Sequence, residues 1–242
     1  MSISTQARRS TATGTAQAAA QLEALSVVLP TATGDLAALR DVDLTVDPAT
    51  SVALTGRSGS GKTTLLSVLG LVRRPTAGVV RIDGYRTCGL ARTEIASLRS
   101  TRVGHVFQSF HLEGSLTAVQ NVMLPWYFRH GRTARRAAKE RGLAVLEMVD
   151  ALGLADRRPS DMAEVDRQRV AIARALVLDP ALLLADEPTT SLDRDAADVV
   201  ADLLLSVPRL TGASVVFVTS RDDVAATADT QVRLHAGELA AP

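Results

Sequence analysis

The sequence predicts an α/β fold in which helices wrap a mostly parallel sheet, with an antiparallel β layer and a helical subdomain insert added to it. Two observations carry this prediction. From residue 51 onward, short apolar runs alternate with segments whose apolar residues recur at helical spacing. Before residue 51, apolar and polar residues alternate one by one, as in a strand with one buried face. With 242 residues, 46% of them hydrophobic, the chain can bury an ordinary core.

The N-terminal part predicts a tail followed by two strands. Residues 1–20 are rich in Ser, Thr, Ala and Gln, so we expect a disordered tail there and one domain over 21–242. The stretches 23–28 and 36–46 are typical of short strands on either side of a turn. In the second stretch the apolar members of the alternation are Val42, Leu44 and Val46. The two strands are expected to form the antiparallel layer.

The rest of the chain alternates between predicted strands and predicted helices. Strands are expected at 51–55, 78–83, 103–107, 182–184 and 215–218. Helices are expected directly after residue 61 and at 93–102, 170–177 and 196–205. A helical subdomain is expected over about 109–160, where the apolar residues with helical spacing are Leu143, Leu146, Val149 and Leu152. The alternation predicts a parallel sheet covered by helices.

Composition narrows the class of protein without naming a function. The formal net charge is +1, with 27 basic and 26 acidic residues mixed along the sequence, so no nucleic-acid partner is expected. Cys88 is the only cysteine, which excludes an intramolecular disulfide and fits a reducing, cytoplasmic setting. No stretch approaches the roughly 20 apolar residues that cross a bilayer, so no membrane span is expected.

A glycine-rich octet follows the predicted strand 51–55. It reads Gly56-Arg57-Ser58-Gly59-Ser60-Gly61-Lys62-Thr63 and satisfies the pattern G-x-x-x-x-G-K-[ST] between a strand and a helix. Its glycines let backbone N–H groups point into one concavity, and the helix N-terminus adds positive charge. Lys62 is expected to reach the β- and γ-phosphates of ATP, Thr63 to coordinate Mg²⁺, and Thr64 to complete the ATP-binding set. The octet therefore predicts a P-loop NTPase.

A second motif lies where the predicted strand at 182–184 ends, because Asp186 and Glu187 follow it directly after Ala185. An open α/β sheet places its ligands at the carboxyl ends of its strands. Asp186 is therefore expected to hold Mg²⁺, and Glu187 to act as the general base toward the attacking water. The alternative is a pair of solvated charges at a strand end, and the preceding P-loop favours the catalytic interpretation.

After residue 22, almost the whole chain resembles the ABC-transporter ATPase family. The matching elements follow the family's order: the P-loop, the Q-loop Val106-Phe107-Gln108, the helix after the signature at 168–176, the Walker B motif at 184–189 and the D-loop Ser191-Leu192-Asp193. The segment 111–125 is similar to the lipoprotein-releasing and macrolide-export branch of the family.

The resemblance implies further roles and partners. Gln108 is implied to contact Mg²⁺ and the attacking water, and Asp193 to belong to the D-loop. Two such subunits close head to tail around two ATP molecules, each site taking its P-loop from one chain and a Leu-Ser-Gly-Gly-Gln signature from the other. The family also implies a membrane-spanning permease, which sets the transported substrate, and a peripheral place on the cytoplasmic face of the cell membrane. The aromatic run 126–128 would either pack in the core or contact that permease.

The sequence departs from the family at three places. The signature positions are occupied by Met162, Ala163, Glu164, Val165 and Asp166. This replacement removes a hydroxyl donor, adds side chains where glycines let the backbone approach the γ-phosphate, and adds negative charge. Ser220 occupies the position of the family's switch histidine, and Leu29 the approximate place of the aromatic that stacks on adenine.

These departures leave more than one functional hypothesis. The first is an ATP-hydrolysing subunit of an ABC transporter, weak on its own, whose signature is supplied by a different chain in a heterodimer. The alternative is a hydrolysis-deficient, nucleotide-dependent regulatory subunit of a heterodimer. A third hypothesis, a soluble ABC protein unrelated to transport, is retained because fold likeness alone does not fix function. It is less favoured because the chain has one nucleotide-binding unit and a helical insert suited to docking membrane loops.

Overall fold

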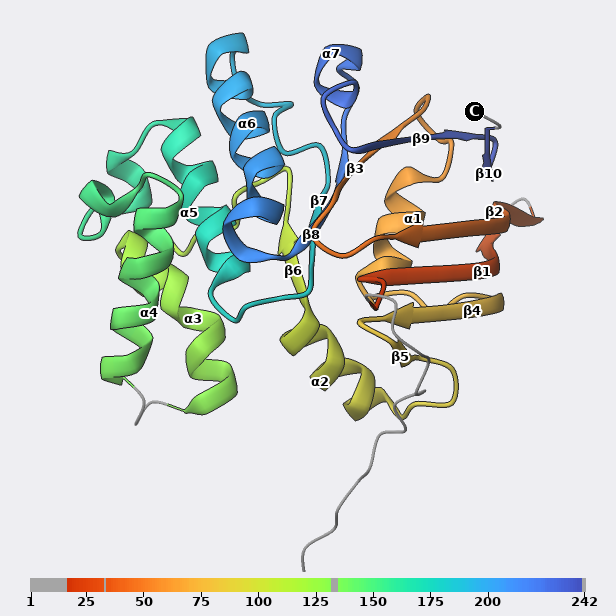
Figure 1. The fold of residues 1–242 in the computed structure, drawn as a ribbon, viewed down its shortest axis with the longest axis horizontal. Coiled ribbons are helices and arrows are strands. Elements are labelled where there is room, and N and C mark those ends of the chain that lie inside the picture. Colours follow the sequence, from red (N-terminus) through yellow and green to blue (C-terminus); the bar gives the residue numbers. More distant parts are fainter. Residues whose placement is uncertain (1–16, 33, 132–134, 241–242) are drawn as a thin grey trace, which may run out of the picture.

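The computed structural model describes residues 17–32, 34–131 and 135–240, and these residues form two sheets with helices around them (Figure 1). The first sheet has the order β2-β1-β4-β5, and all its neighbouring strands are antiparallel. Its strands are β1 (Ala20–Thr31), β2 (Gly34–Val46), β4 (Ala77–Ile82) and β5 (Tyr85–Arg86). Strands β1 and β2 form the predicted antiparallel layer. The strand expected at 78–83 is β4, which pairs antiparallel with β1 in this sheet and does not join the parallel sheet as its place in the alternation had suggested.

The second sheet has the order β10-β9-β3-β8-β7-β6, and every neighbouring pair except β10 with β9 is parallel. Its strands are β3 (Ser51–Thr55), β6 (Val103–Val106), β7 (Leu182–Ala185), β8 (Ser214–Val218), β9 (Thr230–His235) and β10 (Glu238–Leu239). All residues of β3, β7 and β8 are buried, as expected for strands covered on both faces. The predicted mostly parallel sheet is therefore confirmed.

Two hydrophobic cores lie on the two faces of the parallel sheet. Strand β7 shows this directly, since Leu182 and Leu184 belong to one core and Leu183 and Ala185 to the other. Helix α1 (Lys62–Leu69) and the antiparallel sheet complete the first core, and α5 (Glu164–Leu176) and α6 (Arg194–Thr211) contribute to the second. Helix α2 (Arg92–Arg102) leads into β6, and the short α7 (Asp222–Ala225) follows β8. Figure 1 shows α1 and α5 on opposite sides of the sheet.

The helical insert contains a hairpin of two helices, α3 (Ala118–His130) and α4 (Arg135–Met148), followed by the 3-10 helices η2 (Leu152–Leu154) and η3 (Pro159–Asp161). Helix α3 begins at a capping box, in which the Thr117 hydroxyl accepts from the backbone of Gln120 and the Gln120 side chain accepts from that of Thr117. The hairpin lies at the opposite end of the molecule from the antiparallel sheet (Figure 1). The helices α3, α4 and η2 lie within the range 109–160 expected for the helical subdomain, and η3 ends one residue beyond it.

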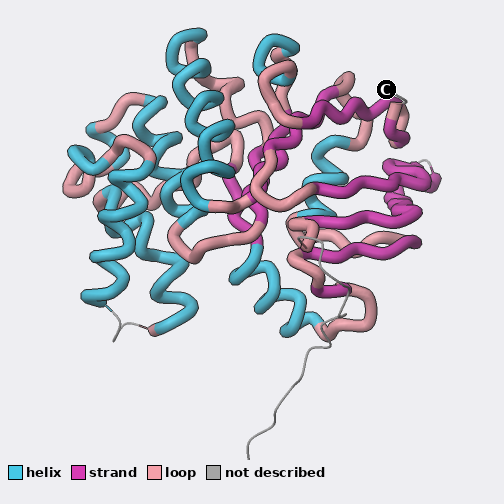
Figure 2. Tube along the Cα trace, in the orientation of Figure 1, coloured by secondary structure: helices cyan, strands magenta, loops and turns pink. Residues whose placement is uncertain are grey.

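The structure departs from the sequence-based boundaries in a few places (Figure 2). Most of the expected tail, residues 1–16, lies outside the described residues. Ala19 and Ala20, which the expectation placed in the tail, are buried instead, and the backbone N–H of Ala19 donates to Val46 O at 2.9 Å. Strands β5, β9 and β10 and helix α7 were not predicted, because these elements are short or mostly polar.

Candidate functional site

The carboxyl edge of the parallel sheet opens into a cavity of about 580 Å³ beside the P-loop. Strand β3 ends at Thr55, and the loop that follows leads into the N-terminus of α1. The lining comes from the P-loop, the ends of β7 and β8, the hairpin of β1 and β2, and the turn between β9 and β10. Its residues from predicted motifs are Gly56, Ser58, Gly59, Gly61, Lys62, Thr63, Thr64, Glu187 and Ser220. Segments far apart in the sequence therefore meet at one edge.

Two glycines of the P-loop hold a backbone that other residues could not adopt. Gly56 has φ 139°, and a Cβ there would lie 2.3 Å from the carbonyl oxygen of Leu234. Gly61, the N-cap of α1, has φ 108°, and a Cβ there would lie 2.6 Å from the carbonyl oxygen of Ala38. The loop packs this closely because both residues lack a side chain.

The other side chains of the octet divide into those that line the cavity and those that support the loop. Lys62 Nζ donates to the carbonyl oxygens of Gly56, at 2.7 Å, and Arg57, at 3.0 Å, so the ammonium group lies inside the curve of the loop. Arg57 is exposed and does not line the cavity. Ser60 is 6% exposed, and among the described residues its hydroxyl has no hydrogen-bond partner.

Asp186 and Glu187 follow β7 at the same edge of the sheet. The Thr63 hydroxyl lies close enough to the Asp186 carboxylate to favour its charged form, so the end of the P-loop meets the end of β7 here. Desolvation and the neighbouring Glu187 charge raise the pKa of Asp186, while Thr63 and the Lys62 ammonium oppose that rise. Glu187 lines the cavity with φ 45°, and its carboxylate accepts from the Thr190 hydroxyl at 3.0 Å.

This chemistry fits a polyphosphate together with a magnesium ion. The N-terminus of α1, the loop N–H groups and the Lys62 ammonium group give the cavity a positive end suited to phosphate. Magnesium in nucleotide sites is held by one or two carboxylates together with substrate phosphates and waters, so a cluster of three acidic or imidazole ligands is not required. No such cluster occurs in the described ranges, and the Thr63 hydroxyl with the Asp186 carboxylate matches the smaller set.

Two residues with implied roles do not line this cavity. Gln108 lies two residues beyond the end of β6 and is exposed. Asp193 is exposed and caps α6, since its carboxylate accepts from the backbone N–H of Ala196 at 2.9 Å. Asp193 therefore has a structural role in this chain whatever it contributes to a D-loop.

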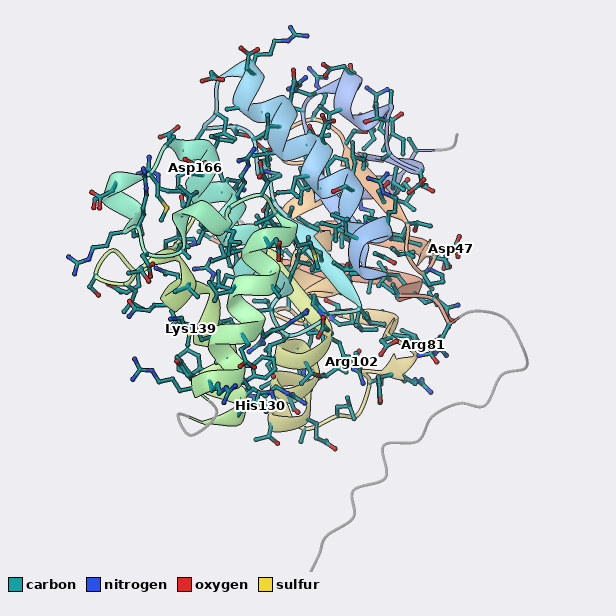
Figure 3. All side chains as sticks on the ribbon, turned by 60° about the vertical axis from the view of Figure 1, so that its left-hand side comes forward. Asp47, Arg81, Arg102, His130, Lys139 and Asp166 are labelled. Carbon is teal, nitrogen blue, oxygen red and sulfur yellow. The ribbon has the colours of Figure 1, made fainter. Side chains whose placement is uncertain are left out.

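The signature positions lie on the opposite side of the sheet from the P-loop. Helix α5 begins at Glu164, and Ala163 is its N-cap without a side-chain hydrogen bond. Met162 is 7% exposed, and Figure 3 labels Asp166 at the upper end of the helical part. Met162, Ala163, Glu164, Val165 and Asp166 do not line the cavity beside the P-loop. Within one chain these positions are therefore separate from the nucleotide cavity.

Ser220 does line the cavity, directly after β8 and beside a network of ion pairs. The Arg221 guanidinium donates to Asp198 on α6 at 2.6 Å and to both carboxylate oxygens of Asp223, at 2.6 and 3.1 Å. Arg221 holds the pKa of Asp223 down at about 2. The network ties the segment that carries Ser220 to the helix that follows the D-loop.

The sequence reasoning missed the turn between β9 and β10, which closes one side of the cavity. The backbone N–H of Gly237 donates to Ser60 O at 3.0 Å, and Gly237 O accepts from the N–H of Arg40 at 2.8 Å. Ala236 and Gly237 both have positive φ, as in a two-residue hairpin turn. An Ala-Gly pair between short, largely polar stretches is a weak signal of that turn, and nothing local shows that it meets the P-loop.

Comparison with known proteins gives a consistent result. Residues 39–190 match the family model described as ABC transporter. The lipoprotein-releasing system ATP-binding protein LolD of Bordetella pertussis is 40% identical over 221 residues, which cover 91% of this chain and 95% of that protein. LolD of Geobacter metallireducens is 41% identical over 206 residues, covering 84% and 89%. The macrolide export ATP-binding/permease protein MacB of Syntrophobacter fumaroxidans is 39% identical over 205 residues, covering 85% of this chain and 29% of MacB.

A solved structure supports the same assignment. The dimeric ATP-binding cassette MJ0796, in a post-hydrolysis state bound to ADP and Pi, superposes with a TM-score of 0.81 at 33% identity and covers 92% of this chain and 97% of that chain. These similar proteins are described as ATP-binding subunits of transporters or as an ATP-binding cassette, so they do not favour the purely regulatory alternative. In the described residues no helix is both long and apolar enough to cross a bilayer. The chain belongs to the ABC transporter family, as an ATP-binding subunit of the ATPase type.

Proposed function

We propose that this cassette couples ATP binding and hydrolysis to transport by a separate membrane-spanning permease, from a peripheral position on the cytoplasmic face of the cell membrane. The observation that carries the proposal is the shared cavity, in which Lys62, Thr63 and Glu187 meet at the carboxyl edge of the sheet. The ATPase domain would span 21–242 and its helical subdomain about 109–160. Relatives named for lipoprotein release and macrolide export support a transport role, and the permease would select the substrate.

The residues of the cavity, together with Asp186 and Gln108 from outside its lining, would divide the work of hydrolysis. The P-loop N–H groups and Lys62 bind the phosphates, and Thr63, Asp186 and Gln108 would hold Mg²⁺. When bound, magnesium neutralises negative charge on the phosphates. Glu187 faces the cavity and would orient the attacking water and accept its proton.

The first turn of α5 supports a heterodimer in place of a pair of identical chains. A bare helix N-terminus attracts phosphate, but Glu164 and Asp166 place two carboxylates in the first turn of this helix. Arg167 lies 3.6 Å from Glu164 and Arg169 lies 3.9 Å from Asp166, so these cations are already engaged by the carboxylates. A second copy of this chain would present that acidic turn to the γ-phosphate. A different cassette with an ordinary signature would complete the site better.

A second cavity, of about 550 Å³, is the proposed docking site for the permease. It lies between α2, β6 and α3 and is mainly apolar, with Phe107, Leu124 and Pro125 in its lining. Phe107 is 45% exposed, although it follows a buried strand and comes directly before Gln108. An apolar groove beside Gln108 would connect a docked permease segment to the nucleotide site. We propose this groove as the docking site.

The proposal is tested by measuring ATP turnover of the purified chain alone and mixed with a cassette that carries a Leu-Ser-Gly-Gly-Gln signature. The expected result is tight Mg·ATP binding with little turnover alone, and turnover that rises on mixing and is lost in Glu187→Gln. A rise that survives Glu187→Gln would show that the added cassette does the work, and it would contradict the assignment of Glu187.

A further inference from the structure

The end of the helical hairpin carries an unbalanced positive charge. Residues 114–139 contain five of the 27 basic residues and none of the 26 acidic residues, which leaves 22 basic and 26 acidic residues elsewhere. The even mixing of charge over the whole chain therefore breaks down in this stretch. Arg132, one of the five cations, lies outside the described residues.

The described cations of this stretch gather where α3 ends and α4 begins. We name this surface the hairpin tip; its four described cations are Arg129, Arg135, Arg136 and Lys139, His130 lies beside them, and all five residues are exposed. Figure 3 labels His130 and Lys139 on the hairpin, in the lower part of the view, well below Asp166, which lies in the first turn of α5. The tip is therefore one surface patch built from two helices.

Little in the described structure neutralises the tip. Arg136 pairs with Glu140 at 2.9 Å, but the side chains are 93% and 65% exposed, and such a pair contributes little. Among the described residues, no carboxylate lies within 4.0 Å of the charged nitrogens of Arg129, Arg135 or Lys139. Arg135 and Arg136 also open α4, where the helix dipole disfavours positive charge. Arg129 and His130 lie in the last turn of α3, where the helix dipole favours basic side chains, but the dipole gives no such reason for Arg135 and Arg136. An external anionic surface would relieve the repulsion among the tip's charges.

An exposed aromatic side chain accompanies the charges. Phe128 is 88% exposed, the highest exposure among the large hydrophobic side chains described. Trp126, two residues earlier, packs its ring on His130 with centroids 4.6 Å apart, so Phe128 is the member of the aromatic run that turns outward. A bulky apolar side chain among arginines and lysines is the combination that binds at the headgroup level of a bilayer.

We infer that the hairpin tip binds the anionic phospholipid headgroups of the membrane beside the permease. Continuity with the proposed docking groove supports this partner, since Phe128 and Arg129 belong both to the tip and to the lining of that groove. A permease segment in the groove would bring the tip toward the lipid surface. The inference rests on the proposed function for its biological setting, but the binding itself requires neither a permease nor ATP.

The test is sedimentation of the full chain with phosphatidylcholine vesicles, with and without phosphatidylglycerol. The chain is expected to bind only the anionic vesicles, and to release them at about 1 M salt, where the Debye length falls to about 3 Å. Each basic residue near an anionic membrane contributes about fivefold, so Arg135→Ser with Arg136→Ser should lower the partition coefficient roughly 25-fold. Phe128→Ala should lower it further.

A matched control is available at the other end of the hairpin. Arg157 and Arg158 are also adjacent and exposed, and they lie beyond the C-terminus of α4, a 14-residue helix about 20 Å long. Arg157→Ser with Arg158→Ser removes the same charge and should leave vesicle binding unchanged. Every variant keeps residues 1–16, so any contribution of that segment is constant.

Three results would overturn the inference: no binding to anionic vesicles, equal binding to neutral vesicles, or equal losses in the two double variants. A double variant of the tip that keeps vesicle binding but loses binding to a single-stranded oligonucleotide would assign the tip to nucleic acid instead. Thermal unfolding of each variant checks the fold. ATP turnover on the same samples reports separately on the proposed function, so the failure of one is distinguishable from the failure of the other.

Discussion

The N-termini of α1 and α5 are the two helix starts that an ABC site requires, and in this chain they differ in kind. Helix α1 begins after Gly61 with no acidic residue in its first turn, and the lysine of the P-loop is its first residue. Helix α5 begins after Ala163 with Glu164 and Asp166 in its first turn. The first start leaves its dipole free for phosphate, and the second offsets its dipole with its own carboxylates.

This difference indicates that two roles have separated in this chain. The first is binding its own nucleotide, and the second, called completion here, is supplying the signature that completes a partner's nucleotide site. The residues proposed to bind nucleotide and to activate water match the family's motifs, whereas those at the signature positions, proposed to face a partner's nucleotide, differ from them. The separation is not complete, because Ser220, which replaces the family's switch histidine, lines the chain's own nucleotide cavity. The variants described next test this separation, from the largest expected effect to the smallest. Two of them are made in a restored-signature variant, which combines Ala163→Ser, Glu164→Gly, Val165→Gly and Asp166→Gln.

The largest effect is expected from removal of the proposed general base. Glu187→Gln in the restored-signature variant should lower turnover by about 10²- to 10⁴-fold while Mg·ATP still binds, because the amide cannot accept the proton of water. Steady-state phosphate release and nucleotide titration measure the two quantities. Turnover within a factor of a few of the parent would remove Glu187 from the chemistry.

Loss of the P-loop lysine should reduce binding itself. Lys62→Ala should weaken Mg·ATP binding by roughly 10²-fold, since it deletes a charge-assisted contact to the phosphates. Lys139→Ala, a change at the only other lysine, is the matched control and should leave affinity unchanged. If calorimetric titration gave equal Mg·ATP affinities for the two variants, the assignment of the α1 N-terminus as the phosphate-binding site would be wrong.

The switch position should have a smaller effect. Ser220→His in the restored-signature variant should raise turnover by on the order of tenfold or more, because an imidazole at the cavity wall can donate to the γ-phosphate. Phosphate release again measures it. No gain would mean that serine already suffices at this position, or that the neighbouring ion pairs keep the segment from moving.

The smallest effect concerns stability below neutral pH. Asp223 has a folded pKa of about 2, below the ordinary value of 3.8, so its stabilising contribution is present above about pH 4 and lost as the pH falls toward 2. Arg221→Ala removes the cause of that shift and should flatten the dependence of Tm on pH between 4 and 2. Arg209→Ala, which changes an exposed arginine at the other end of α6, should leave the slope unchanged.

Local chemistry explains how much of this site the sequence could predict. The P-loop is one contiguous segment whose glycines and flanking elements determine its shape, so Gly56 and Gly61 could be interpreted without a fold. The run of four apolar residues that forms β7 predicted a buried strand, and it therefore also predicted that Asp186 lies at the end of that strand.

The parts that sequence reasoning missed depend on contacts between distant segments. Gly237 closes on Ser60, 177 positions away in the sequence, and no local pattern in either segment specifies the other. The burial of Ala19 and Ala20 likewise depends on pairing with Val46 and Ile82. Gln108 is the reverse case: family order located it, yet here it is exposed and outside the lining, so its role remains a proposal.

The most direct test of the separation between binding and completion compares ATP turnover of the unmodified chain with that of the restored-signature variant, each without a partner, at saturating Mg·ATP. We expect low turnover in the first and a rise of about 10²-fold or more in the second, with similar nucleotide affinity, since the change restores a donor and removes the acidic turn. Equal, ordinary turnover in both would contradict the account, because identical chains would then complete each other's sites despite Glu164 and Asp166.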